Sequence, residues 1–167
     1  MSGTAASADL MACNCAALRK AARRVSLVYD RHLARSGLTN GQYAILAEIA
    51  RRSEYDHPTL SELAQALVMD RTALSHTLNP LERDGLIRLE SDQRDRRARR
   101  VSLTTLGRER ASVARSCWVE AQAHFAETFG RDQAIALQAL LRIVTDLDFD
   151  GTRRSPFADA VVRAPES

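Results

Sequence analysis

The chain has 167 residues, of which 45% are hydrophobic and 27% are charged. This length suits one domain with its own core, and the composition is that of an ordinary globular protein. The longest apolar runs are far too short for a membrane span, and the N-terminus lacks the pattern of a secretory signal. These features do not suggest a membrane or secreted protein, so we expect a cytoplasmic one.

The positive charge of the chain is concentrated in one short stretch. The formal net charge is +3, and the segment from Asp92 to Arg100, with five arginines and two aspartates, carries +3 by itself. The rest of the chain is therefore neutral. A local basic patch of this kind is typical of a surface that meets an anionic partner.

The first part of the chain is predicted to form helices separated by glycines and polar loops. From Leu10 to about Arg35, apolar residues recur at the spacing of one helical face, and Gly37 ends this pattern. A second helix is expected over about residues 42–51. The segment "SEYDHPT" that follows has the composition of a loop.

Two short helices with clear capping signals come next. Thr59 is followed by Glu62 at the capping-box spacing, which predicts the start of a helix. Asp70 is the expected N-cap of a further helix that ends at Gly85. A leucine stripe buries one side of this helix, and its outward residues are Arg71, Thr72, Ser75, His76 and Asn79.

A hairpin and two longer helices complete the pattern. The segments "LIRLES" and "RRVSLT" alternate apolar and polar residues, which predicts two short strands paired around the arginine-rich turn. Thr104 is the expected cap of a long helix to about Phe129, and Gly130 separates it from a last amphipathic helix. Residues 150–167 carry no strong pattern and are expected to form a mobile tail.

This order of elements is that of a winged helix-turn-helix protein. We expect a mainly α fold, with a DNA-binding region over residues 38–104 that includes a small two-stranded wing. Long dimerisation helices are expected to flank it, over residues 10–36 and 105–149. Their apolar faces are more than one winged-helix core can cover, so the sequence predicts a homodimer.

The fold gives the arginine-rich turn a function. The second helix of the turn motif enters the major groove of DNA, and the hairpin places an arginine in the minor groove. We expect Arg94 to make this insertion, Asp92 to orient it and Arg97 to brace the turn or a phosphate. The predicted DNA contacts are Arg71, Thr72, Ser75, His76, Asp92, Arg94, Arg96 and Arg97. The alternative is that the turn is a solvated loop.

From about Leu33 to Gly107 the chain resembles the MarR (multiple antibiotic resistance regulator) family of bacterial transcription factors. The resemblance rests on "LTNGQYAIL", on "TLSELAQALVMDRTALSHTLNPLERDGLI" and above all on D-x-R-D-x-R followed by "VSLTTLG". It implies a homodimer that binds a palindromic operator. It also implies a repressor more often than an activator, relieved by a small aromatic acid, a drug-like compound or thiol oxidation.

An effector pocket is the first of two hypotheses for regulation. In the family the pocket lies where the dimerisation helices meet the winged domain. By this resemblance Tyr29, His32 and Trp118, together with Cys117, are candidates to bind a small aromatic ligand. Arg24 or Arg31 would pair with its acid group. Because aromatic residues at helical spacing are often simply part of a core, that alternative stays open.

Thiol oxidation is the second hypothesis. Cys13 and Cys15 are two residues apart, so on a helix their side chains point about 200° apart and a disulfide between them needs unwinding. Cys15 falls on the apolar face and is expected to be buried, whereas Cys13 lies near the helix start, where a thiolate is favoured. Redox release would therefore use a cysteine of the partner subunit.

Other classes of function lack their sequence motifs. There is no C-x-x-C or H-E-x-x-H spacing, so no metal site is predicted. There is no G-x-S-x-G and no phosphate-binding glycine loop, so we expect neither an enzyme nor a cofactor. A module that binds only other proteins remains as a rival, and DNA binding with a steep salt dependence separates the two.

Overall fold

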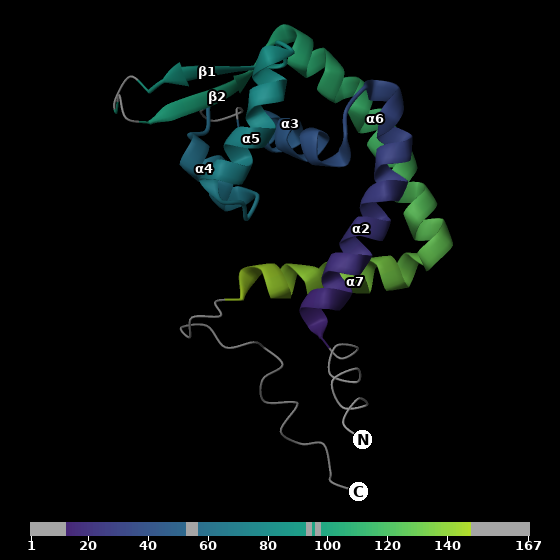
Figure 1. Cartoon of the computed structure of the whole chain (residues 1–167). Helices are drawn as coiled ribbons and strands as arrows, with labels where there is room; N and C mark the ends of the chain where they lie inside the picture. The colour runs from purple at the N-terminus through teal and green to yellow at the C-terminus, as the bar shows by residue number, and fades with distance from the viewer. Residues whose placement is uncertain (1–12, 53–56, 93–94, 96–97, 148–167) are drawn as a thin grey trace, which may run out of the picture. The chain divides into compact units, whose positions relative to one another are not determined.

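The computed structural model describes residues 13–52, 57–92, 95 and 98–147 (Figure 1). The predicted tail, the start of the chain before Cys13, and the wing residues Arg94, Arg96 and Arg97 lie outside the described residues. The chain divides into two compact units, residues 1–122 and residues 123–167. The first unit contains the helix-turn-helix motif and the hairpin.

The predicted fold class is confirmed, because the structure is mainly helical with one small antiparallel sheet. No helix among the described residues has the length and apolar character needed to cross a membrane. The elements are α2 (Asn14–Leu33), the short 3-10 helix η1 (Ala34–Ser36), α3 (Asn40–Arg52), α4 (Leu60–Ala66), α5 (Arg71–Arg83), β1 (Ile87–Ser91), β2 (Arg99–Leu103), α6 (Thr105–Phe129) and α7 (Arg131–Asp146).

Both predicted caps of the turn motif are present. The backbone N–H of Glu62 donates to Thr59 Oγ1 at 3.2 Å, and the N–H of Thr59 donates back to Glu62 Oε2 at 2.7 Å, which completes the capping box of α4. Asp70 Oδ1 accepts from the N–H of Ala73 at 2.8 Å and so caps α5. These bonds fix where the two helices of the motif begin.

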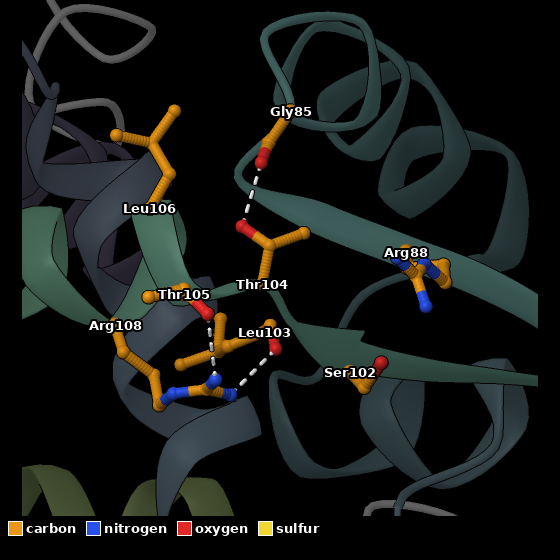
Figure 2. Close-up of a pocket in the computed structure, with 8 residues that line it drawn as sticks. All are labelled: Gly85, Arg88, Ser102, Leu103, Thr104, Thr105, Leu106 and Arg108. Carbon is orange, nitrogen blue, oxygen red and sulfur yellow. Dashed lines mark hydrogen bonds between the residues drawn. The ribbon is translucent and has the colours of Figure 1, made fainter.

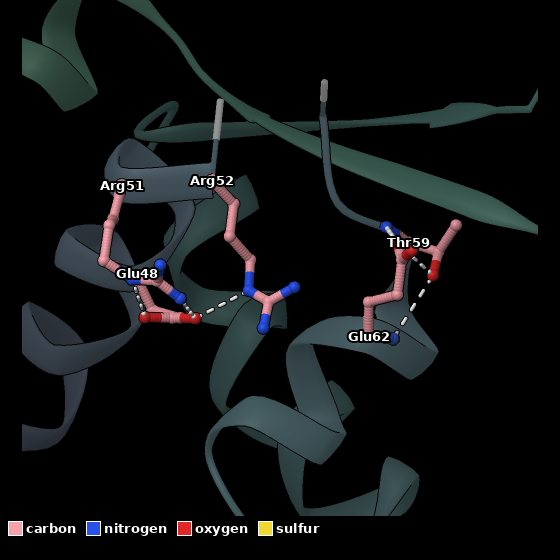
Figure 3. A network of polar contacts seen from close by, with 5 residues as sticks. All are labelled: Glu48, Arg51, Arg52, Thr59 and Glu62. Atoms are coloured by element: carbon pink, nitrogen blue, oxygen red, sulfur yellow. Dashed lines mark hydrogen bonds and ion pairs between the residues drawn. The ribbon is translucent and has the colours of Figure 1, made fainter. Parts of the chain in front are cut away.

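A network of arginines and glutamates lies at the end of α3 and the start of α4 (Figure 3). Arg51 and Arg52 both donate to Glu48, at 2.6 Å each. The pKa of Glu48 lies below its usual value, mainly because Arg51 donates a hydrogen bond to its carboxylate. The pKa of Glu62 is also lowered, first by the backbone N–H of Thr59 and to a smaller extent by the charge of Arg52.

The core of the first unit lies beneath α5. The predicted leucine stripe of this helix is buried, and α5 packs against α4 and β1. The predicted polar face is exposed, as expected. Burial of one side thus sets which side chains α5 offers to a partner. The core residues are Leu46, Ile49, Leu63, Leu74, Leu78, Leu81, Ile87 and Val101.

The hairpin pairs β1 and β2 in antiparallel register, from Ile87 opposite Leu103 to Ser91 opposite Arg99. The other edge of β2 is also occupied, because the N–H of Val101 donates to the carbonyl of Pro58 at 2.9 Å. Thr59 forms an isolated bridge with Arg100 next to this bond. The segment before α4, which the sequence analysis treated only as loop, therefore ties the wing to the turn motif.

The root of the wing is joined to α6 through Thr104. Its hydroxyl donates to the carbonyl of Gly85 at 2.6 Å, and its N–H donates to the carbonyl of Leu86 at 3.1 Å. The same hydroxyl accepts from the N–H of Gly107 at 2.9 Å, so Thr104 caps α6 as predicted. A side chain at Gly107 would collide with the wing root, since a Cβ there would lie 1.9 Å from the carbonyl oxygen of Leu86.

The prediction that Cys15 is buried is wrong for the single chain, where Cys15 is exposed. Leu18, on the same face, is 41% exposed. In α2 the buried residues are Tyr29 and Leu33, both near its C-terminal end. The predicted apolar face is therefore buried only at the C-terminal end of α2 and is exposed in its first half. Periodicity predicts a face but does not tell what covers it.

The second unit shows a similar open apolar face. Its helix α7 carries the predicted stripe, and several members of it are exposed: Leu140 at 53%, Leu141 at 38% and Val144 at 40%. At the end of α6, Phe125 stacks on Phe129 with ring centroids 5.4 Å apart. Exposed apolar surface of this extent is costly in water.

Candidate nucleic-acid interface

The first turns of α5 present four exposed polar side chains: Arg71, Thr72, Ser75 and His76. The cap at Asp70 fixes the start of the helix, so these side chains have a defined position. The hydroxyl of Ser75 donates to the carbonyl of Arg71 at 2.8 Å and keeps its lone pairs as acceptors. An exposed helix start with donors and acceptors of this kind is suited to contact base edges and phosphates.

A hollow of about 230 Å³ lies between the starts of α4 and α5 and the wing. Its walls include the side chains of Ser61, Arg71, Asp95 and Arg99. Two guanidinium groups and a hydroxyl in one concave place are suited to a DNA phosphate. The sequence predicts Arg71 as a DNA contact but gives no signal for Ser61 or Arg99, because only the register of β2 brings Arg99 to the turn motif.

Asp92 anchors the wing from the inside. Its side chain is 5% exposed and forms an ion pair with Arg100. Its other carboxylate oxygen, Oδ1, accepts from the N–H of Asp95 at 3.0 Å. Arg100 also donates to the carbonyl of His57, so one guanidinium joins the wing to the segment before α4. Among the described residues Asp92 thus supports the turn, and its predicted contact with Arg94 stays a prediction.

The predicted effector residues lie at two places along α6. Tyr29 donates to Gln122 Oε1 at 2.8 Å, and Nδ1 of His32 lies 4.0 Å from Glu120 Oε2. Trp118 instead packs against Tyr43 of α3, with ring centroids 6.3 Å apart. Tyr29 and His32 therefore face α6 from α2, while Trp118 faces α3.

A cavity of about 450 Å³ lies between α3, the end of β2 and the first half of α6. Tyr43, Arg108 and Arg115 line it, together with alanines of both helices. Burial raises the pKa of Tyr43, and the charge of Arg115 opposes this. None of the three predicted ligand residues lines this cavity. The cavity has no signal in the sequence, because it depends on contacts between residues far apart in the chain.

The described residues contain no group of three or more histidine, cysteine, aspartate or glutamate side chains that could hold a metal ion. Cys13 is half-buried, Cys15 exposed and Cys117 buried. The interface built by α5, the hollow and the wing is therefore the best-defined candidate site in this part of the chain.

Comparison with known proteins connects this geometry to transcription. Residues 36–98 match the model of the MarR family. The chain is 30% identical over 115 residues to the transcriptional activatory protein BadR of Rhodopseudomonas palustris, a match that spans 66% of this chain and 65% of BadR. It is 34% identical to the structure of the M. tuberculosis transcriptional regulator MosR in complex with DNA, with a TM-score of 0.66 and coverage of 81% of this chain and 99% of MosR. The transcriptional repressor CouR, bound to a 23-mer DNA duplex, is 26% identical with a TM-score of 0.71 over 81% of this chain and 94% of CouR.

The turn motif, the arginine-bearing wing and these relatives define a DNA-binding transcriptional regulator of the winged helix-turn-helix class. Within that class, the chain belongs to the MarR family.

Proposed function

We propose that this protein is a homodimeric repressor that binds a palindromic operator in the cytoplasm and is released by a small aromatic acid. The observation that carries the DNA-binding part is the exposed start of α5 beside the hollow lined by Arg71 and Arg99. In this arrangement a major-groove helix and a phosphate site lie next to each other. The choice of repressor follows the more frequent behaviour of the family, since the names of BadR and CouR indicate opposite effects.

The open apolar faces support the dimer. Leu18 and Leu27 on α2 are 41% and 53% exposed, and Ile135 on α7 is 67% exposed. A second copy of the chain is the partner that covers these faces in our proposal, because a two-fold dimer also places two recognition helices about 34 Å apart, as a palindrome requires. Residues 10–36 and 105–149 are the proposed dimerisation segments.

For base readout we assign Thr72, Ser75 and His76, and for the phosphate contact Arg71. Changing Ser75 or His76 to alanine is expected to alter the preferred base at particular operator positions, with a wrong base costing about 1–3 kcal/mol. Arg71→Ala is expected to weaken binding to all sequences instead. Selection from a randomised duplex pool measures both effects. If the Ser75 and His76 variants select the same consensus as the unmodified protein, the assignment is wrong.

In the wing we assign minor-groove insertion to Arg94, with Arg96 and Arg97 at the turn or at phosphates and Asp92 as support. The ion pair between Asp92 and Arg100 supports this assignment, since it gives the turn a rigid base. Arg94→Ala should weaken binding to the selected operator by at least about 1 kcal/mol at matched salt. An unchanged affinity rules the insertion out.

For the effector we assign the cavity lined by Tyr43, Arg108 and Arg115. An aromatic ring fits against Tyr43, and a carboxylate pairs with the guanidinium groups. Tyr29, His32 and Trp118, the residues that the sequence suggested, remain candidates for a second contact surface along α6. The ligand class that this chemistry supports is an aromatic monocarboxylate.

Redox release is the second candidate, and the exposure of Cys15 favours it, because an accessible thiol can react with an oxidant. In this alternative Cys13 or Cys15 forms a disulfide with a cysteine of the partner, and hydrogen peroxide accepts the two electrons. A Cys13→Ser, Cys15→Ser double variant is expected to keep its response to an aromatic acid and to lose its response to peroxide. If the unmodified protein holds its operator equally well with and without peroxide, this candidate is wrong.

A further inference from the structure

We propose that Arg108 couples the effector cavity to the wing, so that an anionic ligand releases DNA by taking this guanidinium away from the end of β2. The proposal rests on the effector cavity of the proposed function and names the residue that transmits its occupancy. Arg108 and Leu103 line two hollows at once, the effector cavity and a second hollow of about 430 Å³ at the wing root. They form the wall that the two hollows share.

The guanidinium of Arg108 donates two hydrogen bonds, one to the end of β2 and one to the start of α6 (Figure 2). Nη1 donates to the carbonyl of Leu103 at 2.9 Å, and Nη2 donates to Thr105 Oγ1 at 3.2 Å. Leu103 is the last residue of β2, and Thr105 is the first residue of α6. One side chain therefore holds the junction at which the wing continues into the long helix.

The carbonyl of Leu103 is available for this contact because of the hairpin register. Ile87 lies opposite Leu103, and the N–H of Thr104 donates to the carbonyl of Leu86. This pattern makes Ile87 and Leu103 a non-hydrogen-bonded pair, in which the carbonyl of Leu103 points away from β1. Arg108 is the donor that reaches it from the cavity side.

A carboxylate in the cavity competes with that carbonyl. Hydrogen bonds from a guanidinium to an ionised oxygen are shorter and stronger than those to a neutral carbonyl, so the bound acid draws Arg108 away from Leu103. Arg115, which lines the same cavity, supplies a second positive charge for the acid. The wing then loses one of its links to α6 and is held less firmly in the position that DNA requires, although the bonds of Thr104 remain. A ligand acts in this way only if it binds the released state more tightly.

The test measures the coupling between ligand and operator in the full-length protein. Benzoate and trans-cinnamate are the probes, and benzamide is the neutral control, because its amide oxygen lacks the negative charge that would favour it over the carbonyl of Leu103. Operator affinity is measured by fluorescence anisotropy with and without each probe, and probe affinity is measured by calorimetry on the free protein. We expect an acid to weaken operator binding by about tenfold and benzamide to have no such effect.

Substitutions of Arg108 separate the binding of the acid from the effect of the acid on operator binding. Arg108→Gln is expected to keep measurable affinity for the acid through Arg115, while the effect of the acid on operator binding falls towards none. Arg108→Lys, which keeps the charge but lacks the fork, should recover part of the effect. Glu109→Gln, an exposed neighbour on α6, should behave as the unmodified protein. Thermal melts confirm that each variant folds.

The results distinguish an error in the effector cavity from an error in the role of Arg108. If neither acid binds the unmodified protein at concentrations up to about 10 mM, the effector cavity of the proposed function is wrong, and the coupling proposal is overturned with it. If an acid binds and releases DNA from Arg108→Gln as strongly as from the unmodified protein, the cavity stands and the role of Arg108 is overturned. Equal release by benzamide also overturns it.

Discussion

Replacing Gly107 with alanine is expected to lower the free energy of unfolding by about 3 kcal/mol. The new Cβ would lie 1.9 Å from the carbonyl oxygen of Leu86 and 2.9 Å from its carbonyl carbon. Both are backbone atoms of the wing root, so no flexible side chain can move aside. Either α6 or the hairpin must shift, and the bond from the N–H of Thr104 to Leu86 is strained with them. We therefore expect weaker operator binding as well.

Gly41 provides a matched control for this change. It lies in the helix α3, and a Cβ built there meets nothing within 4 Å. Gly41→Ala is expected to raise the free energy of unfolding by about 0.5 kcal/mol, because alanine favours a helix more than glycine does. Denaturant unfolding at matched protein concentration measures both variants. Similar values for the two variants would contradict the close contact at Gly107.

Replacing Arg100 with methionine is expected to cost about 2 kcal/mol of folding stability. The change removes the ion pair that Arg100 forms with the carboxylate of Asp92, which is 5% exposed, and the hydrogen bond that Arg100 donates to the carbonyl of His57. The side chain of Arg100 is itself 26% exposed, so solvent moderates the loss. The wing then lacks the ion pair that holds its turn in place, so operator affinity should fall as well.

Arg99 is the control for the wing, because it directly precedes Arg100 on β2 and its side chain is 53% exposed. Its ion pair with Glu82 spans 4.0 Å and contributes little to stability. Arg99→Met should leave the thermal melt almost unchanged, yet weaken operator binding through the hollow beside α5. If Arg100→Met melts like the unmodified protein, the internal anchor at Asp92 is refuted.

The local features of this fold were predictable from the sequence. Capping signals at Thr59, Asp70 and Thr104 predicted helix starts that the structure confirms, because a cap depends on residues only three positions apart. Alternation predicted the strands around the arginine-rich turn. The polar face of α5 followed from its leucine stripe, so the exposure of the predicted base-reading residues was also correct.

Features that depend on distant residues were not predictable. Arg100 belongs to the same arginine run as Arg99, and only the fold shows that Arg100 pairs with the buried Asp92 while Arg99 is 53% exposed. The cavity that we propose for the effector joins Tyr43 to Arg115, two residues with no local pattern in common. Exposure of Cys15 likewise depends on what covers the first half of α2, which periodicity cannot show.

A footprint of the protein on its selected operator, combined with the stoichiometry of the complex and its salt dependence, tests whether the protein binds a palindromic operator as a homodimer. We predict two chains for each duplex and two protected half-sites about one helical turn apart, roughly 10 base pairs. Affinity should fall by more than about tenfold between roughly 50 and 200 mM salt. A scrambled duplex of equal length that binds equally well at the same salt, or one chain that protects a single half-site with full affinity, would contradict the account.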